Sequence, residues 1–112
     1  MYLVTAVLKP HRLEEVTSAL KDLDVSGMTI SEVQGFGRQR GHTEVYRGSE
    51  YKVDYVPKVR VDVVCDPADA DKVAEVIAES ARTGKIGDGK IWITEVARLV
   101  RIRTGEAGAD AL

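Results

Sequence analysis

The first strand-like segment of this chain is apolar on both of its faces. Residues 2–8 read YLVTAVL, so that every even position is apolar and so are two of the odd ones, Leu3 and Val7. Because successive side chains of a strand point to opposite faces, such a strand has to be covered on both sides. We therefore expect helices of the same chain on one side and another subunit on the other, in a homo-oligomer.

Two segments carry helical periodicity. The first follows Pro10, which fixes a φ suited to a helix start, and ends near Gly27, where we expect the left-handed residue that closes many helices. The second begins at Asp66-Pro67, a capping acceptor followed by proline, and ends at Gly84. Their inner faces are predicted from positions at helical spacing: Leu13, Val16, Leu20 and Leu23, then Val73, Val76, Ile77, Ser80 and Ala81.

The remaining patterns are extended. In residues 58–64, valines on one face alternate with charged residues on the other, and residues 28–36 are rich in β-branched side chains. Residues 91–93 and 96–102 add further strand patterns. The order β-α-β-β-α-β predicts an α+β, ferredoxin-like fold: an antiparallel sheet with both helices on one face. Residues 104–112 are small and polar and are expected to form a mobile tail.

Composition excludes several classes of protein. Among 112 residues, 44% are hydrophobic and the net charge is −2, which is unlike a disordered chain. No apolar run approaches the roughly 18 residues of a membrane span, and no secretory signal is recognisable. Cys65 is the only cysteine, so no disulfide framework is expected and a cytoplasmic protein is the default.

A long middle segment and a glycine-rich turn are the candidate functional parts. Residues 37–55 show no sustained period, and a structureless stretch of that length in a small domain is typical of a functional loop. Residues 84–90 read GKIGDGK and can turn backbone N–H groups toward an anion. Ile91 stands where a P-loop needs Ser or Thr, and the turn follows a helix, so it is not a P-loop.

Basic residues gather near this turn. Residues 82–103 hold six Lys or Arg against two acids, and Arg101 and Arg103 are predicted to share one face of a strand. On an acidic protein this favours an anion site, although a helix-end turn beside a solvated charged face remains the alternative. The glycine turn at 35–41 faintly resembles an RNA-recognition motif, but residues 58–64 contain no stacking aromatic. The main alternative function is that of a small ATP-hydrolysing phosphotransferase, though His11 and His42 are isolated and no catalytic set is evident.

Four blocks of the sequence are similar to the signatures of a known family. They are residues 35–44 (GFGRQRGHTE), 46–51 (YRGSEY), 83–90 (TGKIGDGK) and 101–106 (RIRTGE). On these blocks the chain resembles the PII nitrogen-regulatory signal proteins from nearly end to end. The resemblance implies a single PII-like domain over 1–112, with a T-loop at about 37–55, a B-loop at 82–90 and a C-terminal segment at 102–112.

The resemblance also implies ligands and the residues that bind them. It implies a homotrimer with its sheets facing inward, in which ATP and ADP compete for clefts between subunits. The implied nucleotide-binding residues are Thr29, Gly37, Arg38, Gln39, Asp62, Val64, Gly87, Asp88, Gly89 and Lys90, with Arg101 and Arg103 of the neighbouring subunit. Mg²⁺ is expected at Gln39, and 2-oxoglutarate at Gln39, Arg40, Gly41, Lys58 and Gly87, its distal carboxylate pairing with Lys58.

The implied role is that of a regulator rather than an enzyme. Tyr51 matches a position that is uridylylated or adenylylated in many members, Ser49 a position phosphorylated in some, and Arg47 a loop-tip arginine that plugs ammonium transporters. The implied partners are an ammonium transporter, a glutamine synthetase-modifying enzyme and a nucleotidyltransferase acting on Tyr51, without direct nucleic acid binding. We expect a cytoplasmic signal transducer of nitrogen, carbon and energy status, associated with the membrane through the transporter.

Overall fold

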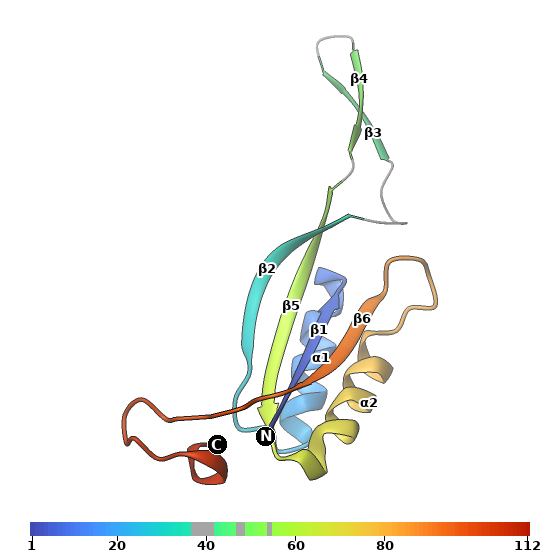
Figure 1. Ribbon diagram of the computed structural model, residues 1–112. Coiled ribbons are helices and arrows are strands. Elements are labelled where there is room, and N and C mark those ends of the chain that lie inside the picture. Colours follow the sequence, from blue (N-terminus) through green and yellow to red (C-terminus); the bar gives the residue numbers. More distant parts are fainter. Residues whose placement is uncertain (37–41, 47–48, 54) are drawn as a thin grey trace.

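A four-stranded antiparallel sheet with two helices on one side forms the body of the protein. This computed structural model describes residues 1–36, 42–46, 49–53 and 55–112 (Figure 1). The strands lie in the order β2-β5-β1-β6, and a separate hairpin pairs β3 with β4. The element order and the antiparallel pairing confirm the predicted α+β, ferredoxin-like architecture.

The elements are short and follow one another closely. The strands are β1 (Tyr2–Leu8), β2 (Thr29–Phe36), β3 (His42–Tyr46), β4 (Ser49–Val53), β5 (Tyr55–Cys65) and β6 (Gly89–Glu95). The helices are α1 (Leu13–Asp22) and α2 (Ala70–Ala81), each preceded by a 3-10 turn, at Pro10–Arg12 and Pro67–Asp69, and a third such turn spans Gly108–Ala111. The Asp66 carboxylate accepts from Ala68 N at 3.0 Å, which confirms the predicted cap.

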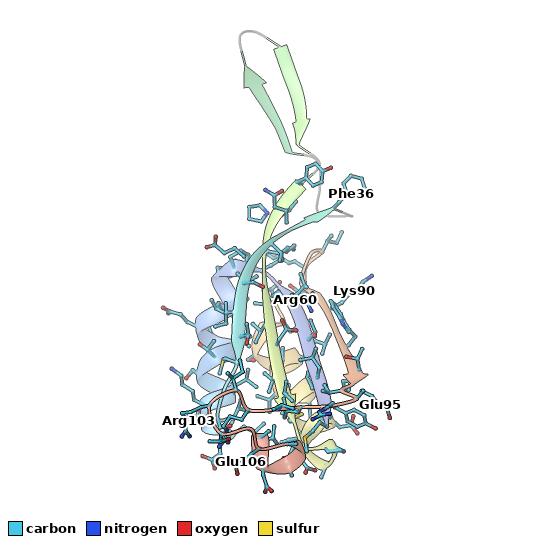
Figure 2. The ribbon with its side chains drawn as sticks, turned by 60° about the vertical axis from the view of Figure 1, so that its left-hand side comes forward. Phe36, Arg60, Lys90, Glu95, Arg103 and Glu106 are labelled. Atoms are coloured by element: carbon cyan, nitrogen blue, oxygen red, sulfur yellow. The ribbon has the colours of Figure 1, made fainter. Side chains whose placement is uncertain are left out.

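The core lies between the helices and one face of the sheet. On this face β1 contributes Val4, Ala6 and Leu8, all essentially inaccessible to solvent, and α1 and α2 cover them. The alternating valines of β5 are buried against the same helices, as their spacing predicts. Figure 2 views the opposite face, which neither helix covers and along which many side chains project. The helices of one chain thus account for one apolar side of β1 and leave the other side open.

The end of α1 differs from its prediction. The left-handed residue is Asp24, with φ of 63°, whereas Gly27 does not adopt a positive φ. Val25 N donates to Leu20 O at 3.1 Å and Asp24 N to Lys21 O at 3.0 Å, which is the hydrogen-bond pattern of a Schellman motif. Asp tolerates this conformation better than most residues, so the helix ends before the glycine is reached.

Three further segments differ from their predictions. Residues 96–102 form no strand; after β6 the chain makes only an isolated bridge between Val100 and Ala107. Residues 104–112 are not an unstructured tail, because they include the 3-10 turn and the Arg101 guanidinium donates to Leu112 O at 2.5 Å. The segment predicted to be structureless contains the β3–β4 hairpin, in which His42 pairs with Val53 and Tyr46 with Ser49.

Candidate functional site

The glycine-rich loop 82–88 connects α2 to β6 beside the end of β1. Gly84, Gly87 and Gly89 all have positive φ, at 82°, 92° and 105°. Gly89 is also the first residue of β6 and pairs with Leu8. A Cβ on Gly89 would lie 1.8 Å from the Val7 carbonyl oxygen, so the loop can join the sheet here only because this residue has no side chain.

Asp88 holds the loop together from inside. Its Oδ2 accepts from the backbone N–H groups of Thr83 and Gly84, each at 2.9 Å, and its Oδ1 accepts a short hydrogen bond from the Thr83 hydroxyl. Lys9 Nζ lies 3.3 Å from the same Oδ1. These hydrogen bonds, led by the one from the Thr83 hydroxyl, hold the pKa of the Asp88 carboxyl well below its usual range.

Acid should therefore destabilise the fold through Asp88. Because its folded-state pKa lies below the ordinary 3.8, its stabilising effect is complete above that value and is lost as the pH falls toward the folded-state pKa. We expect Asp88→Asn to flatten the fall in unfolding free energy between about pH 5 and pH 2 in urea titrations. The exposed Asp110→Asn serves as the control; a wild-type-like pH profile for Asp88→Asn would contradict this assignment.

Two buried lysines flank the loop. The side chains of Lys9 and Lys58 come from the end of β1 and from β5, and both residues are only 8% exposed. Lys58 Nζ donates to the Gly87 carbonyl at 2.5 Å, and Lys9 Nζ donates to Thr83 Oγ1 at 3.2 Å. Burial, and then the charge of Lys9, lowers the pKa of the Lys58 ammonium. Asp88 pairs with Lys9 and its charge also acts on Lys58, so one carboxylate stands near two ammonium groups and this part of the site has an excess of positive charge suited to an anion.

A second polar cluster lies in the middle of the open sheet face (Figure 2). Asp62 accepts from Thr5 Oγ1 at 2.7 Å and from Arg60 Nε at 2.9 Å, and the Arg60 guanidinium lies 6.0 Å from the ring centroid of Trp92. Burial alone would raise the pKa of the Asp62 carboxyl, but the hydrogen bonds from Arg60 and Thr5 outweigh it and lower this pKa. Thr29 pairs with Asp62 in the sheet, so two of the nucleotide-binding residues implied by the family resemblance are neighbours.

Arg101 and Arg103 lie far from the glycine loop within one chain. Strand β6 begins next to the loop at Gly89, which pairs with Leu8, and ends at Glu95, which pairs with Tyr2. The two arginines follow β6, so they and the glycine loop lie at opposite ends of the sheet. Figure 2 shows Lys90 toward one end and Arg103 near Glu106 at the other. The strand on which the two arginines were predicted to share a face is absent, because β6 ends at Glu95; Arg101 pairs with Glu106 at 3.2 Å.

The structure thus brings together part of the predicted site. Lys58, Gly87, Asp88, Gly89 and Lys90 gather at the loop, whereas Thr29, Asp62 and Val64 follow the strands β2 and β5. Ser49 and Tyr51 lie on β4. The predictions on Gly37, Arg38, Gln39, Arg40, Gly41 and Arg47 fall outside the described residues.

Sequence reasoning missed the residues that organise these groups. Thr83 and Lys9 were not predicted as site residues, and Arg60 and Thr5 were not connected with Asp62. A signal was present for Thr83, since Thr and Asp side chains in turns commonly hydrogen-bond to groups of the same turn. Nothing in local spacing links Lys9 to Asp88, because they are brought together only by the pairing of β1 with β6.

Comparison with known proteins defines the class to which this fold and site belong. The family model described as "Nitrogen regulatory protein P-II" matches residues 1–106. The chain is 51% identical to the nitrogen regulatory protein GlnK of Escherichia coli K12 over 112 residues, covering all of both chains. It is 54% identical to the nitrogen regulatory protein P-II of Haemophilus influenzae over 109 residues, 97% of each chain.

A solved structure agrees with the sequence relatives. The crystal structure of Arabidopsis thaliana PII bound to citrate superposes with a TM-score of 0.81 at 37% identity, covering 99% of this chain and 91% of that one. The chain belongs to the nitrogen regulatory protein P-II family. Its relatives are named as regulatory proteins. Among the described residues, no helix has the length and apolar character needed to cross a membrane.

Proposed function

We propose that this protein is a trimeric sensor of nitrogen, carbon and energy status that binds ATP or ADP, and 2-oxoglutarate together with Mg-ATP. The observation that carries this proposal is the buried Lys58 ammonium against Gly87 O, beside a loop of glycines with positive φ. Glycine turns offer backbone N–H groups to phosphates, and a buried ammonium is a partner for a carboxylate. Both ligands can therefore be bound at one place.

The trimer supplies what a single chain lacks. The open sheet face carries the apolar side of β1 and Trp92, which is 41% exposed, so a second copy has a surface to cover. Arg101 and Arg103 lie at the opposite end of the sheet from their own glycine loop and would reach phosphates only on a neighbouring subunit. Thr29, Asp62 and Val64 would lie near the adenosine, with Gly37, Arg38 and Gln39 on the phosphate side.

The small-molecule effector is a dicarboxylate in this proposal. The plant relative whose structure was solved was bound to citrate, a polycarboxylate, which is the same chemistry that Lys58 favours. Gln39, Arg40, Gly41 and Gly87 would complete the 2-oxoglutarate site. Mg²⁺ takes most of its ligands from phosphate oxygens and water in such sites, and Gln39 would supply the protein ligand in this proposal. The described residues hold no cluster of three His, Cys, Asp or Glu that would bind a metal without phosphate.

Signal output would pass through residues 37–55. A ligand that binds one T-loop conformation more tightly shifts the population toward it, so Mg-ATP with 2-oxoglutarate and ADP would favour different conformations. Targets would be an ammonium transporter, contacted through Arg47, and a glutamine synthetase-modifying enzyme. Attachment of UMP or AMP to Tyr51 by a nucleotidyltransferase, or phosphorylation of Ser49, adds bulk and negative charge to that surface and so changes which partners dock.

Titration calorimetry with sedimentation analysis tests the proposal. We expect a trimer that binds ATP and ADP competitively, and that binds 2-oxoglutarate only when Mg-ATP is present. A monomer indifferent to both nucleotides would refute the proposed function. Binding of 2-oxoglutarate that is equally tight without nucleotide would refute the shared magnesium site alone, and ATP turnover at an ordinary enzymatic rate would favour the phosphotransferase alternative.

A further inference from the structure

Three side chains around the glycine loop form a closed set of hydrogen bonds. The Thr83 hydroxyl donates to Asp88 Oδ1 and accepts from Lys9 Nζ at 3.2 Å and from Lys85 N at 3.3 Å. Lys9 Nζ in turn lies 3.3 Å from Asp88 Oδ1. Lys9 belongs to the segment that follows β1, so this set, here called the loop clamp (Lys9, Thr83 and Asp88), ties the loop to the central strand.

Asp88 has little capacity left for a ligand. Its two carboxylate oxygens receive the Thr83 and Gly84 amides, the Thr83 hydroxyl and the Lys9 ammonium. A carboxylate also repels phosphate, so direct contact between Asp88 and a nucleotide phosphate would be unfavourable. Its place in the clamp makes Asp88 an internal anion that shapes the loop from within.

The position of Asp88 makes its side chain important for the conformation of the turn. It stands between Gly87 and Gly89, whose φ values of 92° and 105° few other residues adopt. A Gly-Asp-Gly segment is intrinsically free to adopt many conformations, so the single side chain in it is the only one by which the turn can be anchored. Lys58 holds the neighbouring Gly87 carbonyl from β5.

We propose that Lys9 and Thr83 are positioning residues of the nucleotide site: they hold Asp88 and thereby set the backbone of Gly87, Gly89 and Lys90 that faces the phosphates. The inference rests on the proposed function, because it assigns the clamp to phosphate binding. Neither residue touches the ligand; each acts through Asp88. Lys9 also offsets the charge of Asp88, which would otherwise weaken the attraction of the loop for an anion.

Variants of Thr83 separate positioning from general stability. Thr83→Val removes the hydroxyl and keeps the shape, Thr83→Ser keeps the hydroxyl, and Thr17→Val removes an exposed hydroxyl on α1 as the matched control. We expect Thr83→Val to weaken Mg-ATP by about tenfold and adenosine by less than about twofold, since a lost hydrogen bond to a charged group has roughly this effect. Thr83→Ser and Thr17→Val should bind Mg-ATP within about threefold of wild type.

Calorimetry for Mg-ATP and NMR titration for the weaker ligand adenosine give these values. Equal losses for Mg-ATP and adenosine, or a Thr83→Ser variant as impaired as Thr83→Val, would overturn the inference. Lys9→Met provides the second arm and is expected to reproduce the selective loss of Mg-ATP affinity. Unchanged Mg-ATP affinity in both Thr83→Val and Lys9→Met would also overturn it.

Amide hydrogen exchange tests the loop clamp separately from the proposed function. If the wild type binds no nucleotide, the proposed function fails, and exchange at residues 84–90 then decides the clamp by itself. A clamp that fixes the loop predicts faster exchange of these amides in Thr83→Val than in wild type without any ligand. Equal exchange in the two proteins would show that Thr83 does not hold the loop.

Discussion

Gly89→Ala is expected to destroy the junction of the glycine loop with the sheet. The new methyl would lie 1.8 Å from the Val7 carbonyl oxygen, 2.8 Å from its carbon and 3.1 Å from Leu8 Cα, distances at which atoms overlap. All three atoms belong to the backbone of β1, which is paired on its other side with β5 and cannot retreat. The positive φ of Gly89 adds strain for any side chain. We expect a loss of about 3 kcal/mol or more of unfolding free energy.

Two other glycines provide a graded comparison for this variant. A Cβ on Gly84 would meet no atom within 4 Å but would have to accept a φ of 82°, so Gly84→Ala should lose about 1 kcal/mol. Gly27 has neither the contact nor the positive φ, so Gly27→Ala should be neutral or slightly stabilising. Urea unfolding followed by circular dichroism measures all three. A Gly89→Ala variant no less stable than Gly84→Ala would show that β6 shifts freely along β1.

The periodicity of apolar side chains predicted the sheet and helices of this fold, because these elements form where one face of a segment can be buried. The valine alternation of β5 and the stripe from Leu13 to Leu23 depend on one face being apolar, and this is visible in the sequence itself. The end of α1 was misplaced because Asp24 took the left-handed position before Gly27, a choice set by hydrogen bonds to Leu20 and Lys21. The residues 96–102 have strand composition but find no neighbouring strand to pair with, so propensity alone gave the wrong structure.

The site was harder to predict than the fold. Glycines and lysines of the loop were recognisable from local composition, but its organisation depends on residues far apart in the chain. Lys9 meets Asp88 and Lys58 meets Gly87 only once β1 has paired with both β5 and β6. Arg101 and Arg103, close to the loop in sequence, lie at the other end of the sheet because a whole strand separates them. For these residues, closeness to the loop in the sequence therefore does not predict closeness to it in space.

Lys58→Met should weaken 2-oxoglutarate binding by about 10- to 100-fold while Mg-ATP still binds. Methionine keeps most of the apolar stem, which packs near Gly35, and removes only the ammonium. A carboxylate placed in this half-enclosed site would lose its cationic partner, and charge-assisted hydrogen bonds of this kind correspond to about a 10- to 100-fold change in affinity. The loop would lose one bond, to the Gly87 carbonyl, but would keep the clamp of Lys9, Thr83 and Asp88. Mg-ATP affinity is therefore expected to change by less than about threefold.

Calorimetry at two pH values tests both the role of Lys58 in binding 2-oxoglutarate and the electrostatic origin of that role. Lys21→Met on the exposed side of α1 is the control for the loss of a lysine. Because burial, and then the charge of Lys9, lowers the pKa of Lys58 from its ordinary 10.5, wild-type affinity for 2-oxoglutarate should decline as the pH rises toward that value. The lysine that loses its charge in that pH range is Lys58. The same decline should therefore appear in the control Lys21→Met, which keeps Lys58. Equal losses of 2-oxoglutarate and Mg-ATP in Lys58→Met would mean that Lys58 serves only to anchor the Gly87 carbonyl, and the carboxylate must then bind elsewhere.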